Sequence, residues 1–201
     1  MPRRNRVTPF GALVAVPARG AFLGNRGCLH DTQGIIRRSW ATRAWICCLL
    51  EFKERRRPLM RPGLYTELFF LDEATALAAG HRPCAECRRA DFNRFRAHWT
   101  RGNGLAAPPR APEMDARLHA ERVDPSTRTR RLHRMPADVP DGAFVARGED
   151  ALLVADGRLH RWSPDGYADA GPLPAADGFA LLTPPSAVAA LADGYRPQMG
   201  I

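Results

Sequence analysis

The sequence of 201 residues lacks any long uninterrupted apolar run. A membrane-spanning helix needs about 18 or more such residues, so the pattern predicts no membrane span. Hydrophobic residues make up 45% of the chain and charged residues 25%, and the mean hydropathy is −0.34. That apolar content excludes an intrinsically disordered chain. The length is enough for one or two domains with a real core.

The sequence also lacks the short motifs of nucleotide-binding proteins and common hydrolases. It contains no Walker phosphate loop, no GxGxxG, no GxSxG and no HExxH. Its six histidines show no spacing that indicates a catalytic set. Because catalytic triads are assembled in space and not along the chain, the sequence leaves the catalytic residues unknown.

Cysteine is scarce and is not arranged as in a disulfide-stabilised protein. The number of cysteines is five, which is odd, and four of them form the close pairs Cys47–Cys48 and Cys84–Cys87. The apolar run 11–16 follows several arginines, but Pro17 ends it too early for a signal peptide. The pattern therefore predicts a cytoplasmic protein with reduced thiols.

Lysine is almost absent, since Lys53 is the only one and arginine supplies the rest of the 30 basic residues. Much alanine, glycine and proline accompanies the arginine, a composition typical of a GC-rich genome. The placement of the charge is more informative than its total of +9. Residues 1–61 hold 13 Lys and Arg with three acidic residues, whereas residues 141–201 hold four Arg with eight acidic residues. This asymmetry favours a polyanion-binding module joined to an acidic one.

The hydrophobic pattern predicts an α+β protein. Strands are expected in residues 11–24, 43–52 and 64–70, and helices over 73–79 (capped by Asp72), 85–99 (with a buried stripe of Phe92, Phe95 and Trp99) and 112–123. After residue 141 the pattern changes to β-hairpins, one of which turns at Asp156-Gly157, followed by a strand over 179–183 and a helix over 184–192. We expect three parts: a basic zinc-binding module (1–100), a Pro/Arg-rich linker with a short helix (101–140), and an acidic strand-rich part with a terminal helix (141–201), packed on the first module.

Cys84 and Cys87 form a CxxC at the start of a predicted helix. Two thiolates at this spacing can chelate one metal ion, and the helix N-terminus favours the deprotonated sulfur. A redox pair or buried structural thiols would share the spacing. Zinc needs further ligands, and Cys28 and one of the Cys47–Cys48 pair are the candidates, because neighbouring strand residues face opposite ways. We predict a structural Zn²⁺ site with the ligands Cys28, Cys48, Cys84 and Cys87, with His30 as the alternative fourth ligand.

The run Glu73–Cys87, EATALAAGHRPCAEC, resembles the second half of the zinc-binding domain of Ada-type DNA repair proteins. The resemblance covers residues 66–88, and Ada-like modules are also attached to some bacterial nucleases. Over its whole length the chain also resembles a group of bacterial proteins. The Ada resemblance implies a small zinc-stabilised α/β module in which Cys84 and Cys87 hold Zn²⁺. In that family four cysteines bind the zinc, and the first can accept a methyl group from a DNA phosphotriester.

The chain departs from the Ada pattern in its first half. The family has two cysteines in a short Cys-x-x-x-Cys run there, whereas this chain has Cys28 alone and Cys47–Cys48 on a distant strand. The methyl-acceptor role therefore does not carry over to Cys28 or Cys48. His81 takes a position that is aromatic in the family, which favours a packing ring over a ligand or base.

The basic segment predicts contact with nucleic acid, and with DNA rather than RNA. Cations there alternate with Trp40, Trp45 and Phe52, so that arginines can bind phosphates while an exposed Trp40 stacks on a base. Trp45, within an apolar strand, is expected in the core. The predicted nucleic-acid-binding residues are Arg37, Arg38, Arg43, Lys53, Arg55, Arg56 and Arg57.

These observations favour a zinc-binding protein with a basic surface that binds nucleic acid. Two alternatives belong to other classes. One is a DNA-processing enzyme, either a phosphotriester methyl acceptor or a nuclease. The other is a zinc-stabilised protein-interaction module that uses the acidic hairpins after residue 141.

Overall fold

The chain forms four helices and two mostly antiparallel six-stranded sheets in a computed structural model, which describes residues 1–53, 58–174 and 178–201. The α+β class predicted from the sequence is confirmed. The first sheet has the strand order β2-β1-β5-β3-β4-β6, in which the β1–β5 and β4–β6 pairs are parallel. Its strands are β1 (Arg6–Val7), β2 (Leu13–Val14), β3 (Phe22–Asn25), β4 (Ile46–Cys48), β5 (Leu68–Phe70) and β6 (Arg82–Pro83).

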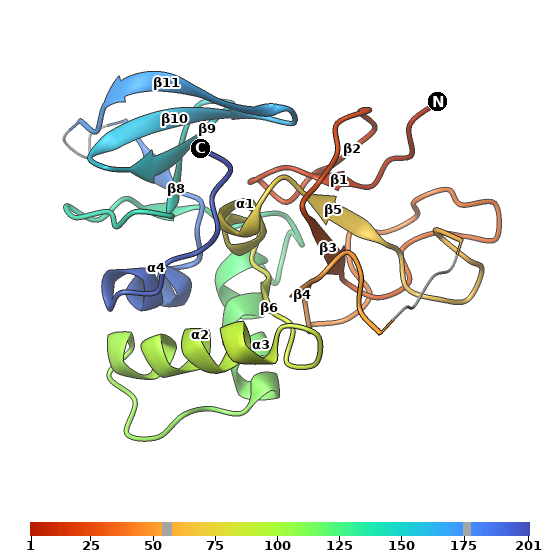
Figure 1. Cartoon of the computed structure of the whole chain (residues 1–201), viewed down its shortest axis with the longest axis horizontal. Helices are drawn as coiled ribbons and strands as arrows, with labels where there is room; N and C mark the ends of the chain where they lie inside the picture. The colour runs from red at the N-terminus through yellow and green to blue at the C-terminus, as the bar shows by residue number, and fades with distance from the viewer. Residues whose placement is uncertain (54–57, 175–177) are drawn as a thin grey trace.

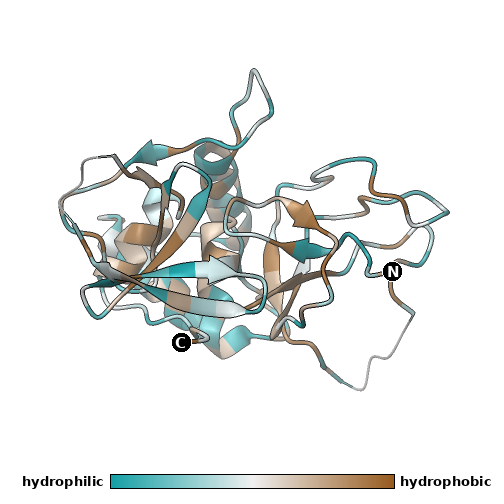
Figure 2. Cartoon of the chain, turned by 90° about the horizontal axis from the view of Figure 1, so that it is seen from above, coloured by the Kyte–Doolittle hydropathy of each residue, from teal (hydrophilic) through white to brown (hydrophobic). Residues whose placement is uncertain are grey.

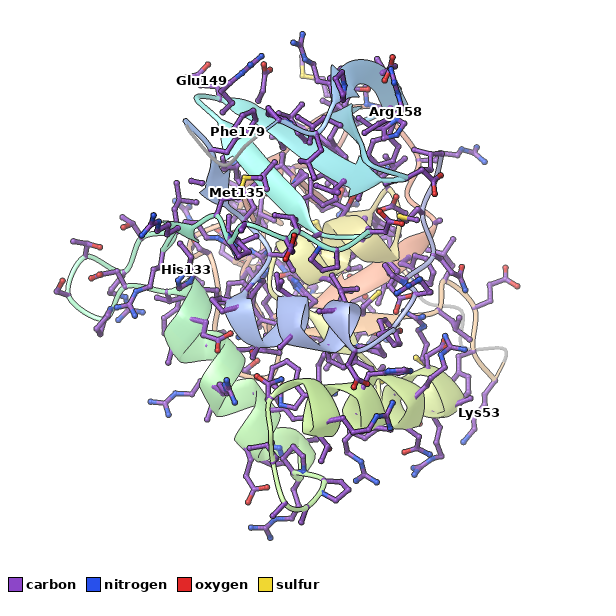
Figure 3. The ribbon with its side chains drawn as sticks, turned by 90° about the vertical axis from the view of Figure 1, so that its left-hand side faces the viewer. Lys53, His133, Met135, Glu149, Arg158 and Phe179 are labelled. Carbon is purple, nitrogen blue, oxygen red and sulfur yellow. The ribbon has the colours of Figure 1, made fainter. Side chains whose placement is uncertain are left out.

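The second sheet is fully antiparallel and has the order β11-β10-β9-β8-β12-β7. The predicted hairpin at Asp156-Gly157 is confirmed, and both turn residues have positive φ, as a tight two-residue turn requires. Met135 is buried in the largest core and the partly buried Phe179 packs against that core (Figure 3). Its strands are β7 (His133–Arg134), β8 (Phe144–Arg147), β9 (Asp150–Ala155), β10 (Arg158–Ser163), β11 (Gly166–Pro172) and β12 (Ala180–Leu181).

Helix α1 (Glu73–Ala78) lies between the two sheets (Figure 1), and all its residues are buried. Asp72 caps it as predicted, because its carboxylate accepts a hydrogen bond of 2.8 Å from the Thr75 amide. Ala76 packs into the core of the first sheet, whereas Ala74 and Ala78 pack into a core of the second. The alanine-rich sequence therefore lets two sheets approach one short helix from different sides.

The remaining helices lie beside one another on one side of the molecule (Figure 1). They are α2 (Arg89–Gly102), α3 (Ala111–Arg122) and α4 (Pro185–Ala192). The aromatic stripe predicted on α2 is buried, and Phe92, Phe95 and Trp99 share the largest core with α3, α4 and the second sheet. Apolar residues lie on strands and helices in the interior, and several outer loops also carry apolar residues (Figure 2), among them the exposed Leu49, Leu50 and Leu59.

Packing crosses both of the domain boundaries expected from the sequence. Phe95 of the expected first module contacts Tyr195 of the last part, with ring centroids 5.0 Å apart. Met114 and Leu118, from the expected linker, are almost completely buried in the same core. The three expected parts remain a prediction, and in the structure they share one core.

Candidate metal centre

Three cysteines, Cys48, Cys84 and Cys87, come together at one edge of the first sheet. Their sulfur atoms all lie within 4.8 Å of one another. The strand pairing explains the meeting, because β4 runs parallel to β6 with Cys47 opposite Pro83, and the Cys84 amide donates to the Cys47 carbonyl at 2.9 Å. Cys48 and Cys84 therefore leave paired strands at the same end, and the turn into α2 brings Cys87 back to them.

Cys47 points away from this group, although it is the direct neighbour of Cys48. It is only 1% exposed and packs in the core of the first sheet, where its sulfur accepts a hydrogen bond of 3.4 Å from Arg88 Nη1. Burial raises the pKa of the Cys47 thiol. The alternation of side chains along β4 thus selects Cys48 for the group and Cys47 for the core.

The three thiols of the group differ in their pKa values. The hydrogen bond with Cys48 lowers the pKa of Cys84 to about 5, and the Glu86 amide also donates to the Cys84 sulfur at 3.4 Å. The pKa of Cys87 is lowered by its own hydrogen bond with Cys48. The same hydrogen bonds raise the pKa of Cys48, so Cys48 keeps its proton to a higher pH than Cys84 and Cys87 do. A soft cation replacing that proton would find deprotonated sulfur ligands.

Cys28 and His30 do not join this group in the part of the chain that the structure describes. The Cys28 thiol lies 3.5 Å from the His30 carbonyl oxygen. Both ring nitrogens of His30 have other partners, since Nδ1 lies 2.6 Å from Thr66 Oγ1 and Nε2 lies 3.2 Å from the Arg61 carbonyl. Of the predicted ligands, the structure brings together Cys48, Cys84 and Cys87, and it holds Cys28 and His30 apart from them.

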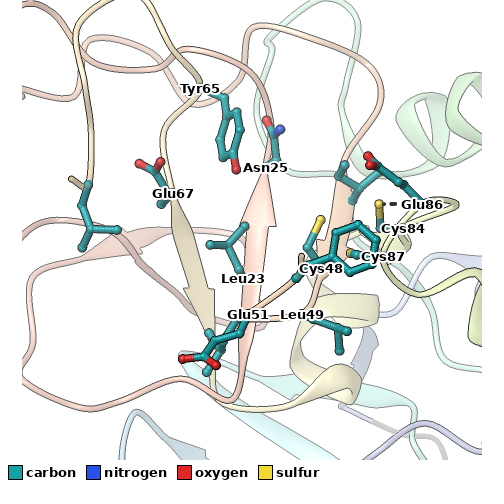
Figure 4. Close-up of a pocket in the computed structure, with 14 residues that line it drawn as sticks. Leu23, Asn25, Cys48, Leu49, Glu51, Tyr65, Glu67, Cys84, Glu86 and Cys87 are labelled. Carbon is teal, nitrogen blue, oxygen red and sulfur yellow. Dashed lines mark hydrogen bonds between the residues drawn. The ribbon is translucent and has the colours of Figure 1, made fainter. Parts of the chain in front are cut away.

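The cysteine group forms one wall of a cavity of about 710 Å³ (Figure 4). Tyr65, Asn25 and Glu67 stand on the other side of this space, on or next to β3 and β5 (Figure 4). Cavities of this size are in the range that holds small-molecule ligands. The remaining lining residues are Leu23, Ile46, Leu49, Leu50, Glu51, Phe52, Leu59 and Glu86.

Arg88 anchors the cysteine turn from within and was not found by the sequence analysis. Its side chain is completely buried and forms ion pairs with Glu73 at 2.9 Å and Asp91 at 2.8 Å. Tyr195 donates a hydrogen bond of 2.7 Å to the same Glu73 carboxylate. The turn that carries Cys84 and Cys87 is thereby fixed to α1 and to the C-terminal segment. The only sequence signal was the position of Arg88 directly after Cys87.

Four of the seven predicted nucleic-acid-binding residues are exposed on the surface of the described structure. Arg37, Arg38, Arg43 and Lys53 are exposed, and Arg37 pairs with Asp31 at 2.7 Å. Lys53 extends away from the molecule (Figure 3). Arg55, Arg56 and Arg57 lie outside the described residues.

The aromatic residues of the basic segment pack against other side chains. Trp40 is half-buried against His119, with ring centroids 4.6 Å apart, and Arg128 stacks on it at 4.7 Å. Trp45 is buried, as the sequence predicted. Base stacking by Trp40 would therefore require it to leave His119 and Arg128, and it stays a prediction.

No protein-family model, curated protein or solved structure in our comparisons matches the chain. The resemblance to Ada-type zinc domains therefore stays a prediction based on residues 66–88. Among the helices of the described residues, none combines the length and the apolar character needed to cross a bilayer.

Proposed function

We propose that this protein binds Zn²⁺ through the thiolates of Cys48, Cys84 and Cys87. The observation that carries the proposal is the approach of three cysteine sulfurs from two separate segments to within 4.8 Å. Thiolates are soft ligands that select zinc over calcium or magnesium, and Zn²⁺ holds sulfur ligands at about 2.3 Å in a tetrahedral arrangement. Sulfurs already this close need only small adjustments to surround the ion.

The proposed zinc has three protein thiolates, and its fourth position is open to the cavity. Structural zinc sites use four protein ligands, whereas sites that bind substrate or water use three. Neither Cys28 nor His30 lies at the cysteine group, while a ligand-sized space does. Zinc in such a position can activate a bound water or polarise a donor atom of a substrate. This geometry favours an accessible zinc centre over the closed four-cysteine site expected from the sequence.

Metal analysis of the purified protein tests the ligand set. We expect about one zinc per chain in the wild type, as a single tetrahedral site requires. Cys48→Ser and Cys84→Ser should lose the metal. Cys28→Ser and Cys47→Ser are matched controls and should keep it. Zinc loss in Cys28→Ser, with retention in Cys48→Ser, would contradict the proposed ligands.

Cobalt substitution tests the open position separately. Tetrahedral Co²⁺ bound to thiolates absorbs in the visible region, so a change of its fourth ligand changes the spectrum. We expect thiocyanate to shift the visible bands of the Co²⁺-loaded wild type in a saturable way. An unchanged spectrum would indicate a closed site with four protein ligands, and would leave the zinc site itself intact.

A second proposed function is the binding of DNA by the basic surface of the first 61 residues. It is supported by the exposure of Arg38, Arg43 and Lys53. Each phosphate contact should add about −0.9 to the slope of log affinity against log salt. The double variant with Arg38→Gln and Arg43→Gln should bind DNA more weakly and show a flatter slope. Arg147→Gln, on the second sheet, should change neither the affinity nor the slope. Binding that does not depend on salt, or no binding at all, would contradict this function.

A further inference from the structure

Three arginines from distant parts of the sequence converge near the C-terminal end of α1. Arg26 and Arg122 both stack on the Trp45 ring, at 4.1 and 3.8 Å from the guanidinium carbon to the ring centre. Arg122 donates to the Gly80 carbonyl at 2.6 Å, and Arg130 donates to the Ala78 carbonyl at 2.6 Å. These contacts place three guanidinium groups around one end of a buried helix.

Among the described residues, no acidic side chain forms an ion pair with this arginine cluster (Arg26, Arg122 and Arg130). Asp115 is the acid close enough to act on Arg122, and it already forms a two-hydrogen-bond pair with Arg82, at 2.9 and 2.8 Å. Burial lowers the pKa of Arg26 to about 9, which still leaves it charged at neutral pH. Uncompensated buried charge is costly in a protein interior.

Several polar atoms of the cluster are buried with no hydrogen-bond partner among the described residues. Arg26 uses Nε for His81 and Nη1 for the Gly11 carbonyl, but its Nη2 has no partner. Part of Arg130 reaches the surface, yet its Nε is buried and unpaired. Native proteins rarely leave buried donors unsatisfied. The other unpaired buried atoms of this region are Arg122 Nε, His81 Nδ1 and Thr8 Oγ1.

The unpaired Arg26 Nη2 and the Nη1 of Arg130 both lie beside the turn formed by Thr8–Gly11. Gly11 has no side chain, and a methyl group added to it would stand 3.6 Å from Arg26 Nη2, 3.9 Å from the Ala79 carbonyl oxygen and 4.0 Å from Arg130 Nη1. Gly11 is itself partly exposed, so this turn lies close to the surface. Guanidinium nitrogens from two segments thus approach one position that no side chain fills.

We propose that the Arg26 and Arg130 guanidinium groups, beside the Thr8–Gly11 turn, hold a small inorganic anion such as chloride or phosphate. The anion would accept hydrogen bonds from the unpaired Arg26 Nη2 and would supply the negative charge that the cluster lacks. Hydrogen bonds from charged donors to an anion are the strong class in proteins. Because Arg26 Nη2 is buried, a free ion fits this site and a phosphate of a nucleic-acid chain does not.

Anomalous diffraction tests the site directly. Crystals of the full chain grown in sodium bromide should show a bromide peak within hydrogen-bond distance of Arg26 Nη2, on the side that faces Arg130 Nη1. An ordered water at that position, with no anomalous signal, would overturn the proposal. This outcome does not depend on the zinc site, because the occupancy of the three cysteines is measured in the same crystal.

Thermal stability tests the site in solution. At constant ionic strength set with sodium gluconate, added chloride or phosphate should raise the Tm of the wild type in a saturable way. Arg130→Met should weaken this response about tenfold or more, as expected for the loss of a charged donor. Arg134→Met, which removes an exposed arginine four residues away, should show the same rise of Tm with added anion as the wild type.

Two results in solution would contradict the site. One is an equal Tm of the wild type in all the salts. The other is stabilisation by a short oligonucleotide but not by free phosphate, which would place phosphate binding on the surface. If Arg130→Met does not fold, the bromide measurement on the wild type still shows whether an anion occupies the site.

Discussion

Arg82 and Asp115 form a buried ion pair directly before the CxxC turn. Each is about one-twentieth exposed, and the guanidinium makes two hydrogen bonds to the carboxylate. Removal of one partner leaves the other charge buried and unpaired. We expect Asp115→Asn to lower the free energy of unfolding by about 3–5 kcal/mol. Chemical denaturation of both proteins measures the difference.

An exposed ion pair is the control for that experiment. Arg158 and Asp169 lie 2.5 Å apart, with side chains 48% and 57% exposed. Because solvent screens such pairs, Asp169→Asn should cost less than about 1 kcal/mol. Equal losses in Asp169→Asn and Asp115→Asn would show that burial does not determine the contribution of the pair.

His81 is completely buried in contact with Phe70 and Trp45, as a packing ring would be. Burial and the nearby Arg26 hold the pKa of His81 well below its ordinary value. A histidine whose pKa is lower in the folded state stabilises the fold above the unfolded-state pKa, and this stabilisation is lost as the pH falls. Below about pH 6.5, this residue alone should reduce the free energy of unfolding by up to about 1.4 kcal/mol per pH unit.

Comparison with His81→Gln isolates this contribution, since both proteins keep the same cysteines. The curve of unfolding free energy against pH should fall less steeply for the variant below about pH 6.5. His160→Gln, on strand β10, is the control for loss of a histidine and should follow the wild type. Parallel curves for the wild type and His81→Gln would contradict the buried neutral imidazole.

At the scale of elements, α2 and α4 pack against each other at Gly102 with no room for a side chain. A β-carbon added at this glycine would collide with the Ala189 carbonyl group of α4. Gly102→Ala should therefore push the helices apart and lower the free energy of unfolding by about 1–3 kcal/mol, the usual cost of overpacking. Asn93→Ala, on the exposed face of α2, should change it by less than about 0.5 kcal/mol. A Gly102→Ala protein as stable as Asn93→Ala would contradict the close approach.

Elements with strong local signals could be predicted from the sequence. Asp72 followed by an alanine-rich run gave α1 and its cap, and Asp156-Gly157 gave the hairpin between β9 and β10. Short strands such as β1 and β6 have two residues each and exist because a neighbouring strand pairs with them. No local pattern of residues encodes such pairing, so the sequence analysis missed them.

The candidate site also has some features that the local sequence predicts and others that depend on long-range contacts. The CxxC spacing identified Cys84 and Cys87, strand alternation limited the next ligand to one of Cys47 and Cys48, and we favoured Cys48. The selection of Cys48 depends on the parallel pairing of β4 with β6, which is a long-range contact. The separation of Cys28 from the group depends on the loop after β3, where backbone bonds join residues 29–37 to one another. Neither feature could be derived from spacing alone.

At the scale of the whole molecule, the basic charge of the first 61 residues is divided between surface and interior. Arg38 and Arg43 are exposed, whereas Arg26 is 1% exposed and stacks on Trp45. A count of charges along the sequence therefore overstates the charge available to a partner. Only the exposed residues should contribute to the salt dependence of binding.

The shared core predicts one cooperative unfolding transition. Phe92, Phe95 and Trp99 are buried by residues of the last part of the chain, so a fragment of residues 1–100 would expose them. We expect this fragment not to fold by itself, and calorimetry of the full chain to give equal van't Hoff and calorimetric enthalpies. A fragment with dispersed amide proton resonances in an NMR spectrum would contradict the shared core.

The buried network of Arg88, Glu73 and Tyr195 couples the proposed zinc site to the C-terminal end of the chain. The contacts that hold the cysteine turn in place also hold Arg88 in its ion pair with Glu73. Tyr195 donates a hydrogen bond to the same Glu73 carboxylate. Such coupling is reciprocal: if zinc protects the C-terminal segment from hydrogen exchange, that segment must tighten zinc by the same free energy. Tyr195→Phe, which removes one hydroxyl far along the sequence from every cysteine, should therefore weaken zinc affinity measurably in a competition with a chelator.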